Sequence, residues 1–140
     1  MSSKVQTYDP KKVIVTFGGT IITGFADGTF IQISAASDLF SKKVGSDGEV
    51  ARSRSNDDTY EVTLTLMQTS LSNKVLNAFK EADKLSSTGV LPLTITDVSG
   101  AGLFFWPQAW IKKSPGGEYA KEVGDRQWVF DTGQISGESI

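Results

Sequence analysis

The chain has 140 residues, 39% of them hydrophobic, and a net charge of −2 at neutral pH. Because affinity for nucleic acid depends on clustered Lys and Arg, this charge balance argues against a surface built to grip phosphate backbones. The absence of His and Cys removes the usual general base near neutral pH, thiol chemistry and the commonest zinc ligands.

Motifs of catalysis and of membrane insertion are also missing. We find no Gly-x-Ser-x-Gly elbow and no glycine-rich phosphate loop. Carboxylates alone can hydrolyse glycosides, but nothing selects a catalytic pair among the 16 acidic residues. No apolar run approaches the roughly 20 residues that span a bilayer, and the polar start lacks the apolar centre of a signal peptide. We therefore expect no enzyme activity, no cofactor, no metal site and no membrane anchor, in a chain made in a cytoplasm-like compartment.

Turn residues divide most of the chain into short strands. Gly18-Gly19 and Asp27-Gly28 accept positive φ and can reverse a chain in few residues, so they predict tight turns between strands. A mainly β fold is therefore expected. The predicted strands cover residues 12–17, 20–23, 29–35, 38–44, 49–55, 59–67, 91–98, 103–112 and 126–132.

The hairpin at 38–55 differs from the other strands because it offers few apolar side chains to a core. A two-stranded hairpin of this kind is marginal in water. It is therefore either a solvated arm or an arm that docks on a neighbouring chain. In the second case the contact residues would be its apolar and cationic side chains, which are Leu39, Phe40, Lys42, Lys43, Val44, Val50, Arg52 and Arg54.

A change of period marks the one convincing helix, at about 71–86. In the preceding strand, apolar residues alternate with Glu61, Thr63 and Thr65, as expected when one face is buried. From residue 71 the apolar residues follow a helical spacing instead, and they predict a stripe packed on the sheet. The members of this stripe are Leu71, Val75, Ala78, Phe79, Ala82 and Leu85.

Aromatic residues gather in the last two predicted strands. On a regular strand, Phe104, Trp106 and Trp110 share one face, which is usual for a sheet packed on a core or against another subunit. The other interpretation is a carbohydrate-binding β-sandwich in which Trp106, Trp110 or Trp128 stacks on sugar rings. The sequence leaves both open.

The order of these segments resembles the tail tube proteins of contractile-tailed bacteriophages, whose fold is related to the inner-tube proteins of type VI secretion systems. The resemblance covers most of the chain. It rests on Phe17-Gly18-Gly19, on the segments 22–28, 45–49 and 62–70, on Arg52-Ser53, Asn73 and Leu76, on the turn at 97–100, and on Trp128.

The length predicts one domain over 1–140, and the polar or Gly-rich composition of residues 1–9 and 133–140 predicts mobile tails. The resemblance implies a β-sandwich or barrel-like subunit with one flanking helix and an extended hairpin. It implies hexameric rings that stack into a hollow tube in the virion tail, assembled in the host cytoplasm. The expected partners are other copies of the chain, the tail sheath and the baseplate. Double-stranded DNA would pass through the tube without specific binding. A different tail component, such as a baseplate ring, remains an alternative.

A conduit should be wet inside and should not hold its cargo, which favours hydroxyl and carboxylate side chains over Lys and Arg. Such side chains alternate with apolar ones on two of the predicted strands. An outer solvated surface is the other interpretation of this pattern. The candidate lumen residues are Glu61, Thr63, Thr65, Thr94 and Thr96.

Overall fold

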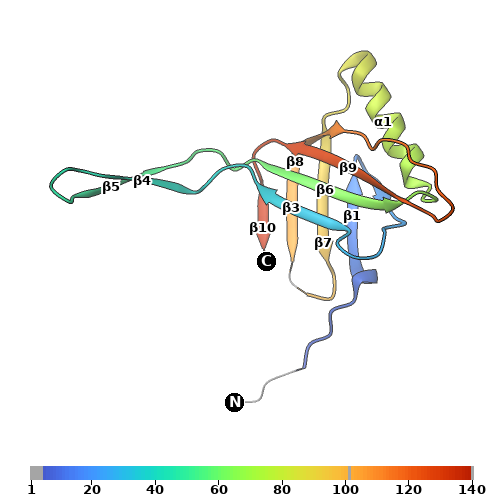
Figure 1. The fold of residues 1–140 in the computed structure, drawn as a ribbon, viewed down its shortest axis with the longest axis horizontal. Coiled ribbons are helices and arrows are strands. Elements are labelled where there is room, and N and C mark those ends of the chain that lie inside the picture. The colour runs from blue at the N-terminus through green and yellow to red at the C-terminus, as the bar shows by residue number, and fades with distance from the viewer. Residues whose placement is uncertain (1–4, 101, 140) are drawn as a thin grey trace.

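The computed structural model describes residues 5–100 and 102–139. Within these residues it is mainly β with one α-helix, as predicted, and the nine predicted strands are all present with ends within two residues of those expected (Figure 1). A tenth, short strand was not predicted. The elements are the 3-10 turn Pro10–Lys12, β1 Val13–Phe17, β2 Thr20–Ile22, β3 Ile31–Ala35, β4 Phe40–Val44, β5 Val50–Arg54, β6 Tyr60–Met67, α1 Ser72–Ser86, β7 Leu91–Asp97, β8 Leu103–Lys113, β9 Asp125–Thr132 and β10 Gly137–Ser139.

One antiparallel sheet, in the order β2-β1-β7-β8-β9-β6-β3, folds over to enclose the core. Phe17 of β1 meets Phe130 of β9 edge to face at 5.0 Å, although two strands separate them in the sheet. The first layer is therefore β2, β1, β7 and the start of β8, and the second is the end of β8, β9, β6 and β3; their strands cross in Figure 1. β2 and β3 each have one edge that pairs with no other strand. The sheet is therefore not a closed barrel, which was one of the two folds predicted from the sequence.

A bulge in β8 moves the strand from one layer to the other. Trp106 pairs with Leu93, but Ala109 rather than Gln108 pairs with Leu91, so one extra residue is inserted near Pro107. Proline in a sheet favours such bulges because it cannot donate to the ladder. As a result Trp106 and Ala109 are both fully buried, and Trp110 lies on the opposite face. The expectation that Trp106 and Trp110 share a face is wrong for this reason.

Helix α1 packs on the sheet through its first turns only. Leu76 is fully buried, and Phe79 contacts Phe17 edge to face at 5.3 Å. The predicted stripe is only partly correct, because Leu71 and Leu85 are 76% and 85% exposed. The C-terminal end of α1 extends past the sheet, where a side chain has nothing to pack against (Figure 1).

Gly18 allows the close approach between β1, β7 and the helix. Its φ is +60°, and a Cβ there would lie 2.8 Å from Leu91 Cδ1 and 3.1 Å from the ring of Phe79. A larger residue would therefore force the Leu91 and Phe79 side chains to shift as well as strain the turn.

The C-terminal segment is not a free tail over residues 133–139, contrary to the expectation for 133–140. β10 pairs with the start of β8, and the backbone N–H of Ile135 donates to the carbonyl of Asp58 at 3.1 Å. The Tyr60 hydroxyl donates to Glu138 Oε2 at 2.7 Å. These contacts fix the segment beside the base of the β4–β5 hairpin. Residues 5–9 form no regular element, and Met1–Lys4 lie outside the described residues.

The bond between Tyr60 and Glu138 gives a pH test of this arrangement. It raises the pKa of Tyr60 to about 12, with a further contribution from burial. Since the folded pKa lies above the ordinary value of 10.0, the stabilisation is fully present below pH 10 and is lost as the pH rises through 12. We expect Glu138→Gln to lower the pKa of Tyr60 in a titration of tyrosinate absorbance, with Tyr60→Phe identifying the signal. An unchanged titration in Glu138→Gln would show that the carboxylate does not hold the hydroxyl.

Candidate assembly surfaces

The hairpin β4–β5, together with the residues that lead into it, forms a projecting arm at 38–55. Its two strands pair only with each other, and all ten of their residues are exposed. The arm stands away from the body in Figure 1. Its base continues the ladder between β3 and β6, where the N–H of Ala36 donates to the carbonyl of Thr59 at 3.0 Å. The base of the arm is therefore held by the main sheet, whereas β4 and β5 project away from it.

The two faces of the arm differ in chemistry. Residues directly opposite in the ladder share a face, and the Arg52 guanidinium lies 4.2 Å from the centre of the Phe40 ring. We call the apolar and basic side the cationic face. It carries Phe40, Lys42, Val44, Val50, Arg52 and Arg54, whereas the other face carries Ser41, Lys43, Ala51 and Ser53.

The structure brings six of the eight predicted contact residues together on the cationic face. Lys43 lies on the other face, and Leu39 precedes β4 and is exposed. Alternation along each strand of the sequence already separates these two sets of residues. The register of the hairpin then shows which residues of the two strands lie on the same face.

The predicted lumen residues do not form one surface. Glu61 and Thr63 lie on the outer side of the second layer, whereas Thr94 and Thr96 lie on the outer side of the first. Thr65 is only 7% exposed, because the chain at 25–30 covers the end of β6 and hydrogen-bonds to its backbone. A single lumen can therefore contain at most one of the two groups.

The outer side of the second layer is the more polar of the two, and we call it the polar face. The outer side of the first layer presents instead the exposed apolar residues Ile14, Ile21 and Leu103. Most members of the polar face were not predicted from the sequence. The available signal was that they alternate along their strands with buried residues such as Trp128 and Phe130. The polar face comprises Gln32, Ser34, Glu61, Thr63, Trp110, Lys112, Gln127, Val129 and Asp131.

Lys112 pairs with two carboxylates that face each other on neighbouring strands. Glu61 and Asp131 are directly paired across β6 and β9, an arrangement that repels when both are charged. The Lys112 ammonium lies 2.9 Å from Glu61 Oε2 and 3.9 Å from Asp131 Oδ1. The hydrogen bond to Glu61, followed by the charge of Asp131, raises the pKa of Lys112 above its ordinary value. The polar face therefore keeps a net negative charge around a cation that is already paired.

Removing this cation should weaken the fold slightly and only where Lys112 is charged. We expect Lys112→Met to lower Tm by a small amount at neutral pH, because Glu61 and Asp131 then repel without compensation. Since the folded pKa of Lys112 is raised, the difference from the parent protein is present below the ordinary Lys pKa and disappears as the pH rises through the folded value. Thermal melts across this range measure it. Lys113→Met is the matched control, and an equal effect there would contradict the assignment.

The aromatic residues offer little to a sugar. Trp106 is fully buried and Trp128 is 3% exposed, with its Nε1 donating to Asn73 Oδ1 at 2.9 Å. Trp110 is partly exposed and lines a shallow depression of about 600 Å³ between Glu61, Asp131 and the base of the arm. Two of the three indoles proposed for sugar stacking therefore belong to the core.

Within the described residues, no helix has the length and apolar character needed to cross a bilayer. The same residues contain no group of three or more acidic side chains placed to hold a metal ion.

Comparison with known proteins agrees with this geometry. The chain matches the family model of the bacteriophage PhiTE tail tube protein over residues 10–138. It is 29% identical over 138 residues to structural protein ORF10 of Pseudomonas phage KPP10, a match that covers 93% of this chain and 80% of that protein.

Solved structures of contractile injection systems share its fold. The tube-terminating cap of the anti-feeding prophage superposes with a TM-score of 0.68 at 12% identity, covering 99% of this chain and 96% of the cap. A chain of the sheath-tube complex of the PVC extracellular contractile injection system superposes with a TM-score of 0.64 at 11% identity, covering 93% of this chain and 90% of that one. The resemblance drawn from the sequence is confirmed, and the chain belongs to the phage tail tube family described by the bacteriophage PhiTE protein, with a structural role in the virion tail.

Proposed function

We propose that copies of this chain assemble into hexameric rings, and that the rings stack into a hollow tube through which the phage genome is delivered. The observation that carries the proposal is the arm, which exposes Phe40, Val44 and Val50 and whose two strands pair only with each other among the described strands. An isolated hairpin is marginal in water, and exposed apolar side chains gathered on one face indicate a binding surface. Another copy of the chain would supply the missing contacts.

The open edges of the sheet support the same arrangement. β2 and β3 each present one unpaired side, and such edges tend to pair with other chains. Continuing the sheet from subunit to subunit around a closed ring would leave no edge exposed.

The lumen of the proposed tube is the polar face. Four strands from each of six subunits, spaced about 4.8 Å apart and tilted about 40°, give a circumference near 150 Å and a backbone diameter of roughly 48 Å. A DNA duplex fits inside such a ring. Because Lys112 is paired with Glu61 and Asp131, the face offers no free cation among its described residues and repels phosphate. DNA would then pass without specific binding, and Thr94 and Thr96 would lie outside the lumen.

The tail sheath and the baseplate are the other proposed partners. The solved neighbour from the PVC system comes from a sheath-tube complex, and its fold is the one found here. With the polar face turned inward, α1 and the outer side of the first layer remain available for a sheath. Assembly in the host cytoplasm and a role without catalysis complete the proposal.

A second candidate is a single ring that ends a tube. It is favoured by the cap of the anti-feeding prophage and by the sheath/tube terminator of the PVC system, which superposes with a TM-score of 0.63. The two candidates differ in whether the top and bottom surfaces of the ring match each other.

Electron microscopy of the purified protein separates these outcomes. We expect long tubes in concentrated samples, or in samples supplied with a tail-initiating baseplate complex. Rings that never stack would indicate the terminator. Isolated particles in both samples would refute self-assembly.

A further inference from the structure

We infer that the cationic face of the arm docks on the loop between β8 and β9 of a second copy of the chain. This inference rests on the proposed self-assembly and names the surface that receives the arm. We call residues 114–125 the acidic loop.

The acidic loop is exposed and combines charge with apolar side chains. Tyr119 and Val123 are 85% and 62% exposed. Glu118, Glu122 and Asp125 lie beside them, and none of these three carboxylates has a hydrogen bond or ion pair with another described residue. With Lys121 as its one basic residue, the loop has a net charge of −2 and offers a partner both negative charge and apolar contact.

The nearby arginine does not use these carboxylates. Arg126 donates from Nη1 to the backbone carbonyl of Asp125 at 3.1 Å and from Nη2 to that of Glu118 at 3.3 Å. Its guanidinium lies 5.7 Å from the centre of the Tyr119 ring. Arg126 thus shapes the loop through its backbone and leaves the side-chain oxygens available.

Three carboxylates near the base of the arm are poorer acceptors because they already have partners. Asp57 accepts from Ser37 and Thr59, and this lowers the pKa of Asp57. Glu61 is paired with Lys112, and Glu138 accepts from Tyr60. An incoming arm would have to break these contacts, whereas at the acidic loop it breaks none.

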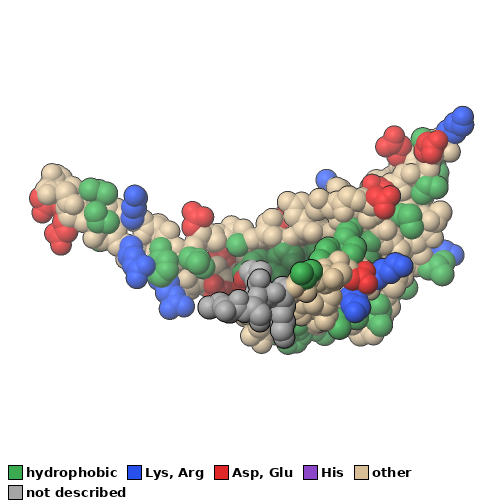
Figure 2. Space-filling model, turned by 90° about the horizontal axis from the view of Figure 1, so that it is seen from below, with side chains coloured by type: hydrophobic (Ala, Val, Ile, Leu, Met, Phe, Trp, Pro, Cys, Tyr) green, Lys and Arg blue, Asp and Glu red, His purple; other side chains and the backbone are tan. Residues whose placement is uncertain are grey.

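The arm matches the loop in charge and in apolar character. β4 and β5 carry four basic and no acidic side chains, and Figure 2 shows Lys and Arg along these strands, with Asp and Glu at the tip of the arm. Beside the loop runs a groove of about 440 Å³, lined by Glu118 and Asp125 and also by Lys113 and Arg126, which adjoins the polar face at Gln127 and Val129. Arg52 and Arg54 would meet these carboxylates, while Val50 would meet Val123. Such steering by charge makes the association salt-dependent.

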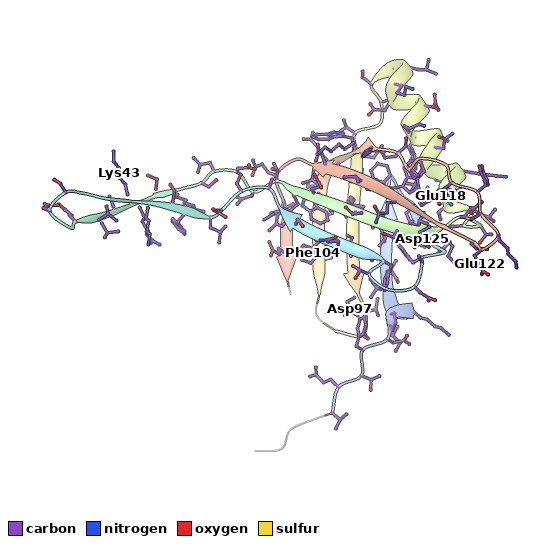
Figure 3. All side chains as sticks on the ribbon, viewed as in Figure 1. Lys43, Asp97, Phe104, Glu118, Glu122 and Asp125 are labelled. Carbon is purple, nitrogen blue, oxygen red and sulfur yellow. The ribbon has the colours of Figure 1, made fainter. Side chains whose placement is uncertain are left out.

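The placement of the two surfaces favours a repeating contact between copies. In Figure 3, Lys43 of the arm lies at one end of the molecule, and Glu118, Glu122 and Asp125 lie at the opposite end. An arm cannot reach the loop of its own chain across this length. Each copy can instead donate an arm to one neighbour and receive an arm from another, the head-to-tail geometry that builds rings and filaments.

Disulfide trapping tests the contact directly, because the chain has no Cys of its own. Val50→Cys lies on the cationic face, and Val123→Cys lies in the acidic loop. We expect a mixture of the two single variants, oxidised at assembling concentration, to give a linked dimer on a non-reducing gel. Ala51→Cys is the matched control, since it neighbours Val50 but lies on the other face. Equal linking from both positions, or none from Val50, would overturn the inference.

Charge reversal provides an independent readout. Lys42→Glu should reduce tube formation by at least tenfold, and Lys43→Glu, on the other face, should have a much smaller effect. Arg52→Glu mixed with Glu122→Arg should recover tubes that neither variant forms alone. If the parent chain forms tubes but the loop variants do too, the receiving surface is wrong and the proposed function stands. If the parent chain forms no assembly, both are wrong.

Discussion

A chain in which an Asn-Gly turn replaces residues 38–55 is expected to fold and to form no tubes. The two strands of the arm pair only with each other and contribute no residue to the described core, so removing them takes nothing from it. The ladder between β3 and β6 reaches Ala35 and Tyr60, and residues 56–58, which the C-terminal segment holds, remain in place. An Asn-Gly pair suits the tight turn that then joins the two sides.

Circular dichroism and thermal melts measure the fold of this variant, and electron microscopy measures its assembly. Its free energy of unfolding should change by about 0.5 kcal/mol or less, as for exposed positions. The control is Ser41→Ala with Ser53→Ala, which alters the other face of the arm and should leave tube formation intact. Tubes formed without the arm would remove its assigned role, whereas an unfolded variant would show that the arm supports the body.

Leu76→Asp is expected to abolish folding. Leu76 is fully buried between α1 and the sheet. Truncating such a leucine to alanine costs about 2–5 kcal/mol, and an unpaired carboxylate adds a desolvation penalty of several kcal/mol. Domains of this size have about 5–15 kcal/mol of stability in total, so the substitution uses most or all of it. Insoluble expression, or a circular dichroism spectrum without the native signal, is the expected outcome.

Leu85→Asp is the matched control, because it makes the same chemical change on the same helix at a position that is 85% exposed. It should leave Tm almost unchanged. Two equally stable variants would mean that α1 does not pack through Leu76, and two unfolded variants would mean that its C-terminal end is covered.

The helix shows what local pattern can and cannot predict. Its presence and approximate bounds follow from the 3.6-residue spacing of apolar side chains. The contact face does not, because Leu71 and Leu85 fit the stripe as well as Phe79 does. Only the tertiary structure decides that these two side chains face water while Leu76 is enclosed. Leu71 is the N-cap residue that precedes α1, and Leu85 lies at the end that extends past the sheet.

β8 shows the same limit in a strand. Strict alternation places Trp106 and Trp110 together, but one inserted residue near Pro107 reverses the second half of the strand. Proline within a predicted strand was the available signal for this bulge. The bulge changes the surface, since it turns Trp110 and Lys112 outward onto the polar face beside Glu61.

The sequence alone determined the mainly β class, the positions of nine strands and the helix, the composition of the arm and the membership of the tail tube family, because these follow from local spacing and from residue order. The tertiary structure decided which side chains share a surface. It divided Glu61 and Thr63 from Thr94 and Thr96, and it set the cationic face and the acidic loop at opposite ends. Both results depend on how the sheet folds over on itself. The contacts that fold it, such as that between Phe17 and Phe130, join residues far apart in the chain, so local sequence patterns do not predict them.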